Sequence, residues 1–159
     1  MPMLVLGRDE LIAEWVARQT PGMTNAADFG PSTAIGFKVG NEFVCGVVFN
    51  NFRKGVHGND VSLSIFSTNS KWVSRGTLRA VFSYAYHQLG CVRVTAITAK
   101  SNKRARRFLT KLGFVQEGTA RRAFDGRAPA LIYGMLLPDE CKWLTQDGWE
   151  ERRVSTRAA

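Results

Sequence analysis

Residues 102–118 read NKRARRFLTKLGFVQEG, and this stretch decides the fold. Its apolar residues recur at helical spacing and form one stripe, made of Ala105, Phe108, Leu109 and Leu112. Gly113 follows the stripe at the place where a left-handed helix cap is wanted, and an extended run begins directly after it. The stretch therefore predicts a short basic helix that starts near Asn102 and passes at once into a strand.

The sequence around this stretch predicts elements in the order helix, strands, helix, strand, helix, hairpin. The ranges are a helix at 9–18, helical turns at 24–29, strands at 33–39, 42–52 and 60–67, a helix over 78–89, a strand at 91–98, and hairpin strands at 114–124 and 129–137. The polar residues 50–59 predict a loop, and Pro138 is expected to open a short terminal helix. The central strand–helix–strand unit predicts a mixed sheet with a right-handed crossover.

The composition is that of a globular protein with room for one core. The chain has 159 residues, of which 45% are hydrophobic and 22% charged, so one domain is expected. No apolar run approaches the roughly 18 residues of a membrane span. The three cysteines are an odd number at no metal-ligand spacing, which predicts reduced thiols and a cytoplasmic protein.

Positive charge is the strongest compositional bias. The net charge of +9 favours an anionic partner, which could be a nucleotide cofactor, an acidic protein or nucleic acid. Six cations fall within twelve residues: Lys100, Lys103, Arg104, Arg106, Arg107 and Lys111. This run fits a solvated helix face, a site for cofactor phosphates, or a nucleic-acid surface. The absence of interleaved aromatic residues argues against a platform that stacks single-stranded bases.

The Asn-opened basic helix with its Gly-Phe exit resembles the fourth helix of the GNAT N-acetyltransferases. Glu117, Gly118 and Arg121 resemble the branch that acts on ribosomal-protein N-termini. The resemblance implies an α+β (α/β) fold: a mixed, mostly antiparallel sheet of six to seven strands, about four helices and a central β-α-β unit. It implies one acetyltransferase domain over residues 1–145, with a polar tail at 146–159. Similar short chains occur in bacteriophages, so a phage origin stays open.

The same resemblance implies an enzyme that uses acetyl-coenzyme A. The expected reaction is direct transfer of the acetyl group to a primary amine, which would be a protein N-terminus, a lysine or a small amine. The alternative is a GNAT-fold protein that has lost its cofactor and binds nucleic acid or an acidic protein, for example as a phage virion or host-takeover protein. Either a monomer or a homodimer is compatible with the sequence.

The loop that binds pyrophosphate in this family has the pattern Q/R-x-x-G-x-G/A, and both glycines are missing here. The pattern falls on Asn69, Trp72 and Ser74. In one interpretation Ser74, Arg75 and Gly76 remake an anion site, with Lys71 and Arg79 contributing charge. In the other, Ser74 is only a helix N-cap, Trp72 is a packed anchor, and the basic residues are a solvated surface.

Further cofactor contacts follow from the resemblance alone. The family counterpart of Asn102 hydrogen-bonds the pantetheine arm, and Arg106 is the cation of the basic helix that we expect to meet a cofactor phosphate. A backbone N–H of the preceding strand, around Ile65, Phe66 and Ser67, is expected to polarise the thioester carbonyl.

The catalytic residues are the least defined part of the sequence. The family tyrosine that acts as an acid is replaced by Leu109, which leaves water or Tyr133 as the acid. Asp60 opens a strand where relatives place an acidic base that works through water, although a turn-forming Asp is the alternative. His57 and His87 have no partners at metal-ligand spacing, so no metal site is predicted.

Overall fold

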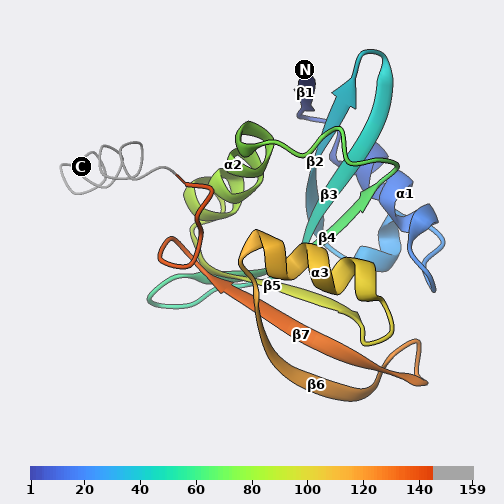
Figure 1. Cartoon of the computed structure of the whole chain (residues 1–159), viewed down its shortest axis with the longest axis vertical. Coiled ribbons are helices and arrows are strands. Elements are labelled where there is room, and N and C mark those ends of the chain that lie inside the picture. The colour runs from blue at the N-terminus through green and yellow to red at the C-terminus, as the bar shows by residue number, and fades with distance from the viewer. Residues whose placement is uncertain (145–159) are drawn as a thin grey trace.

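The computed structural model describes residues 1–144, which form one seven-stranded sheet with helices on both faces (Figure 1). In chain order the elements are β1 (Pro2–Val5), α1 (Asp9–Gln19), β2 (Ser32–Val39), β3 (Glu42–Arg53), β4 (Asn59–Ser67), α2 (Arg75–Ser83), β5 (Cys91–Ala99), α3 (Lys103–Leu112), β6 (Val115–Phe124) and β7 (Ala128–Leu136). The predicted α+β class is confirmed. The predicted polar tail, 146–159, lies outside the described residues.

The sheet has the strand order β1-β2-β3-β4-β5-β7-β6, and only β4 and β5 run parallel. A parallel pair needs a crossover, and α2 supplies it. The two strands pair only between Asn59–Ser62 of β4 and Cys91–Thr95 of β5. Beyond Ser62, β4 pairs with no described strand on that side, while β5 continues along β7. The carboxyl ends of β4 and β5 therefore diverge, with α3 in front of the opening (Figure 1).

Two hydrophobic clusters hold the helices to opposite faces of the sheet. α2 and α3 pack with the inner residues of β3, β4, β5 and β7, while α1 packs on the other face against β2 and β3. Gly46 on β3 allows α1 to pack closely on the sheet, because a Cβ at this position would lie 2.5 Å from Val16 Cγ2 on α1. Near the diverging strands, α2 and α3 therefore cover one face of the sheet and α1 covers the other.

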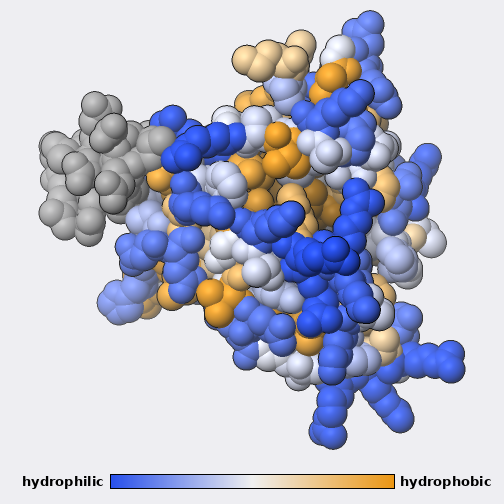
Figure 2. Space-filling view, in the orientation of Figure 1, coloured by the Kyte–Doolittle hydropathy of each residue, from blue (hydrophilic) through white to orange (hydrophobic). Residues whose placement is uncertain are grey.

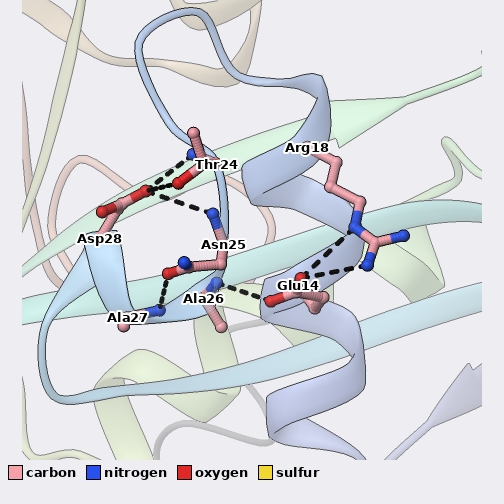
Figure 3. Close-up of polar contacts among 7 residues, drawn as sticks. All are labelled: Glu14, Arg18, Thr24, Asn25, Ala26, Ala27 and Asp28. Atoms are coloured by element: carbon pink, nitrogen blue, oxygen red, sulfur yellow. Dashed lines mark hydrogen bonds and ion pairs between the residues drawn. The ribbon is translucent and has the colours of Figure 1, made fainter.

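The loop between α1 and β2 is tied down by side chains that accept backbone N–H groups (Figure 3). Asp28 accepts from the N–H of Thr24 at 2.7 Å and from that of Asn25 at 3.2 Å, and the first of these bonds contributes most to lowering its pKa. Glu14 on α1 accepts from the N–H of Ala26 at 2.7 Å. The predicted helical turns are present as a short 3₁₀ turn that rests against α1.

Several predicted boundaries were wrong. A first strand, β1, precedes α1, and β3 continues to Arg53, so the loop predicted at 50–59 shrinks to residues 54–58. The long helical stripe is an α-helix only to Ser83 and then becomes a π-helical turn, Tyr84–Gln88. Around Pro138 the described residues, up to Leu144, form turns and no helix. The Trp143 indole donates to the Leu112 carbonyl at 2.8 Å and holds this segment across the end of α3.

Three further features of the described residues concern their cysteines, their potential metal ligands and their helices. Cys45, Cys91 and Cys141 are free and buried, and burial raises the pKa of Cys91 to about 11. No group of three or more potential metal ligands occurs within residues 1–144. In the same range, no helix combines the length and the apolar composition that crossing a membrane requires. The thiols thus act as small apolar groups in the core.

Candidate functional site

The opening between β4 and β5 brings together two helix starts and a stretch of unpaired strand. In the part of the chain that the structure describes, the last residues of β4, from Leu63 to Ser67, have no strand partner on the β5 side. α2 begins just after β4 and α3 just after β5, so both helices present their first N–H groups near this opening. Ligands of α/β sheets bind beyond the carboxyl ends of strands, and helix starts favour anions. This end of the sheet is therefore the candidate site.

A cleft of about 520 Å³, here called cleft A, lies between the β4–α2 loop and α3. Its walls are Ser67, Ser70, Trp72, Val73, Arg104, Arg107, Phe108 and Lys111. Figure 2 shows an apolar recess in this region with hydrophilic side chains over α3. Of the predicted cofactor residues, Ser67 lines cleft A directly. No sequence signal distinguishes Arg104, Arg107 and Lys111 from the other cations of the run.

The start of α3 carries positive charge that the described part of the chain does not neutralise. Its first turn has no acidic residue, and no ion pair within residues 1–144 involves α3. Cations at a helix start oppose the helix dipole, at a cost of about 0.3–1 kcal/mol each. Asn102 caps the helix by accepting from the N–H of Ala105 at 3.1 Å. An anion in cleft A would offset the unfavourable charge at this helix start.

The start of α2 is closed by a capping box. The N–H of Thr77 donates to Ser74 Oγ at 3.1 Å, and the N–H of Ser74 donates to Thr77 Oγ1 at 2.9 Å. Ser74 is therefore a helix N-cap and its own N–H is occupied. The N–H groups of Arg75 and Gly76, the first two helical residues, have no partner inside the helix. They are the donors that this loop still offers to an anion.

Trp72, at the first missing glycine, is part of the hydrophobic core. It is 1% exposed, stacks on Phe37 with ring centroids 5.5 Å apart, and meets Phe108 of α3 at 6.2 Å. The loop around it is closed by its own hydrogen bonds, from the N–H of Lys71 to Asn69 Oδ1 and from the N–H of Val73 to the Ser70 carbonyl. The interpretation of Trp72 as a packed anchor is confirmed.

Asp60 belongs to a polar cluster at the opposite end of β4. Its Oδ1 accepts from Thr95 Oγ1 at 3.0 Å and lies 3.7 Å from Arg93 Nε. Arg93 also binds both carboxylate oxygens of Glu117, and this hydrogen bonding lowers the pKa of Glu117. Arg93 and Thr95 alternate along β5 with Val94, which lies in the core beneath α2. The cluster therefore lies on the sheet face opposite α2 and α3.

The pKa of Glu117 makes stability pH-dependent. Glu117→Gln should lower the free energy of unfolding by about 0.5 kcal/mol at pH 7, as is typical of partly exposed ion pairs. A lowered carboxyl pKa contributes stability that is present above the unfolded pKa of about 4.3 and is lost as the pH falls through the folded pKa. Urea unfolding from pH 3 to pH 7 measures the difference, with the exposed Glu42→Gln as control. A difference that is the same at every pH would contradict this assignment.

Tyr133 and Arg106 line another space, here called cavity B, of about 510 Å³ between α3 and the β6–β7 hairpin. The lining residues are Lys103, Arg106, Arg107, Thr110, Lys111, Gln116 and Tyr133. Neither Tyr133 nor Arg106 lines cleft A. The structure thus separates the predicted site residues into three places, because Asp60 lies on the other sheet face.

The remaining predicted residues lie around cleft A without lining it. Ile65 packs on the core under the helices, and Phe66 points to the other face, where its ring centroid lies 5.2 Å from that of Trp15. Both backbones belong to the stretch of β4 that pairs with β3 but not with β5. Lys71 is exposed in the β4–α2 loop, and Arg75 and Gly76 are exposed in the first turn of α2.

A family model described as "Acetyltransferase (GNAT) domain" matches residues 7–115. The match covers more than half of the chain, so this protein belongs to the GNAT family of N-acetyltransferases, a family that uses acetyl-coenzyme A. The predicted family and fold are confirmed. The sequence has no significant match among curated proteins.

Three solved structures show the same fold. Ribosomal-protein-S5-alanine acetyltransferase from Vibrio fischeri is 11% identical, with a TM-score of 0.62 over 87% of this chain and 93% of that chain. Mutant forms of the spermidine/spermine N-acetyltransferase SpeG from Vibrio cholerae are 12% identical, with a TM-score of 0.66 over 86% and 95%. RimJ from Mycobacterium smegmatis, in complex with CoA-disulfide, is 16% identical, with a TM-score of 0.62 over 87% and 83%.

Proposed function

We propose that this protein transfers the acetyl group of acetyl-coenzyme A directly to a primary amine, with the coenzyme in cleft A. The observation that carries the proposal is the position of this cleft. It lies where β4 and β5 diverge, beside two helix starts and an unpaired strand edge, and α3 lines it with three cations. A phosphate-bearing, extended molecule fits this combination of charge and free backbone groups.

Other groups of this chain would hold the coenzyme in place of the two missing glycines. The N–H groups of Arg75 and Gly76 remain for the pyrophosphate at the start of α2. Arg104 and Arg107 on the facing wall supply charge-assisted hydrogen bonds, which take over part of the role of a glycine-rich loop. The Asn102 carboxamide caps α3 through its oxygen, which leaves its NH₂ group for the pantetheine arm.

The transfer forms a C–N bond and breaks the C–S bond of the thioester. The attacking amine must first lose a proton, and water is the proposed acceptor, because Asp60 lies at the opposite end of β4, on the other sheet face, where its Oδ1 accepts from Thr95. A backbone N–H in the unpaired stretch Ile65–Ser67 would polarise the carbonyl. Water would return a proton to the leaving thiolate, because Tyr133 lines cavity B and not cleft A.

Removing the Asn102 amide tests the coenzyme site. Wild-type protein should bind acetyl-coenzyme A at micromolar concentration by calorimetry, and Asn102→Ala should weaken binding by about tenfold, the value of one hydrogen bond. The Ala variant also loses a helix cap, at a cost of about 1 kcal/mol. Asn102→Ser keeps the cap and removes only the NH₂ donor, so a similar loss in both variants assigns the effect to the amide.

Turnover separates transfer from simple binding. Coenzyme A release should depend on an added amine, and the acceptors named for the structural neighbours supply two probes, a peptide N-terminal alanine and spermidine. No detectable binding at millimolar acetyl-coenzyme A, or release that no amine accelerates, would contradict the proposed function.

A further inference from the structure

Cavity B has the chemistry of a binding site, and the proposed transfer does not use it. Its wall on α3 consists of four cations and one hydroxyl, and the hairpin strands contribute an amide and a phenol. With a volume of about 510 Å³ it falls in the range of small-molecule sites. Arg107 and Lys111 also reach cleft A, whereas Lys103, Arg106, Gln116 and Tyr133 belong to cavity B alone.

Tyr133 places an unsatisfied donor in this cavity. The residue is 2% exposed, and its hydroxyl has no hydrogen-bond partner among residues 1–144. Every fully enclosed side-chain polar atom in the described part of the chain has a partner. The Tyr133 hydroxyl must therefore reach the space of cavity B, the cavity that its side chain lines. A nearly buried hydroxyl without a partner is unfavourable, and a bound acceptor would correct this.

Within residues 1–144, the cations around Tyr133 have no acidic partner. Residues 100–127 hold nine of the cations of the chain but only two carboxylates. Glu117 is paired with Arg93, and Asp125 accepts N–H groups of its own turn. One Arg106 nitrogen donates to the Lys100 carbonyl at 3.0 Å, and the other guanidinium donors have no partner among residues 1–144. A ligand for cavity B must therefore be an anion.

We propose that cavity B is a second anion site, separate from the coenzyme site, which binds a small molecule through a terminal phosphate or pyrophosphate group. Arginine forks and lysines bind phosphate oxygens, and the phenol adds a recessed donor. A terminal phosphate can enter a recess, whereas an internal phosphodiester is flanked by sugars on both sides. The position of Tyr133 thus favours a small ligand over the nucleic-acid backbone.

The test is a calorimetric titration of inorganic pyrophosphate into the full chain saturated with coenzyme A. Pyrophosphate should bind once, in addition to the coenzyme. Arg106→Gln and Tyr133→Phe should each weaken this binding by about tenfold or more, the value of a hydrogen bond to a charged group. Arg104→Gln is the matched control, because Arg104 lines cleft A only; it should weaken coenzyme binding and change pyrophosphate affinity by less than twofold.

The outcomes separate this site from the proposed function. Tyr133→Phe should fold, since its hydroxyl bonds to nothing in the described residues, and a thermal melt checks this. If coenzyme A does not bind, the titration is made on the free chain, and the Arg104 and Arg106 variants still distinguish the two spaces. Displacement of pyrophosphate by coenzyme A, unchanged affinity in both cavity B variants, or binding of polyadenylate without binding of pyrophosphate would overturn the proposal.

Discussion

Trp72→Gly should lower the free energy of unfolding by about 3–5 kcal/mol, although it restores a glycine of the family loop pattern. The reason is that Trp72 is 1% exposed and packs between Phe37 and Phe108. Removing its ring leaves a cavity between the sheet, the β4–α2 loop and α3. For a chain of this size the melting temperature should fall by roughly 10 °C.

Urea and thermal unfolding measure this effect, and Val73→Gly is the matched control. Val73 lies in the same loop but is 39% exposed, so its replacement introduces the same backbone freedom and removes little packing. A loss below about 1 kcal/mol in Trp72→Gly would contradict the anchoring role. Coenzyme binding should not improve in this variant, because the loop closes its N–H groups on itself.

The ends of the basic helix, α3, could be predicted from the local sequence. Asn102 caps α3, and Gly113 ends it with φ at 107°, as the sequence predicts. The Asp125-Gly126 pair forms the hairpin turn, with positive φ at both residues. These features depend on side-chain to backbone bonds and on glycine conformations within a few residues, so sequence alone defines them.

The arrangement of the site could not be predicted in the same way. Leu109 and Leu112 face the core and so fix the rotation of α3, and that rotation decides which cations reach cleft A and which reach cavity B. The charge run shows how many cations α3 carries but not which of them line cleft A and which line cavity B. That depends on where the β4–α2 loop and β6 lie. Arg106 was thus predicted for the cofactor and lies in cavity B.

The alternation of side chains between the two faces of the sheet explains why the two predicted catalytic residues, Asp60 and Tyr133, lie apart. A register shift at Asn59/Asp60 precedes the pairing of Asp60 with Arg93, and the Asp60 side chain bonds to Thr95 on the open face. Tyr133 pairs with Ala96 on the face beneath the helices. A single bulge or change of register reverses which face a strand residue occupies. Alternation in the sequence could therefore not decide whether the two residues meet.

Reversing the two arginines of cleft A should remove most of the affinity for acetyl-coenzyme A. Each charge-assisted hydrogen bond is worth about 1.5–3 kcal/mol, so Arg104→Glu combined with Arg107→Glu should weaken binding at least 100-fold. The variant should fold, because Glu near a helix start is favourable to the dipole and neither arginine has an ion-pair partner within residues 1–144. Calorimetry at constant salt measures the loss.

Net charge alone could also produce a loss of affinity, and a second pair of arginines separates the two causes. Arg121→Glu combined with Arg122→Glu changes the total charge by the same amount, on exposed residues of β6 that do not line cleft A. At 0.15 M salt the Debye length is about 8 Å, so distant charges are largely screened while those in the cleft are not. An equal loss in both variants would show that the coenzyme responds to overall charge. A loss confined to the Arg104 and Arg107 variant would place the phosphates between α3 and the β4–α2 loop.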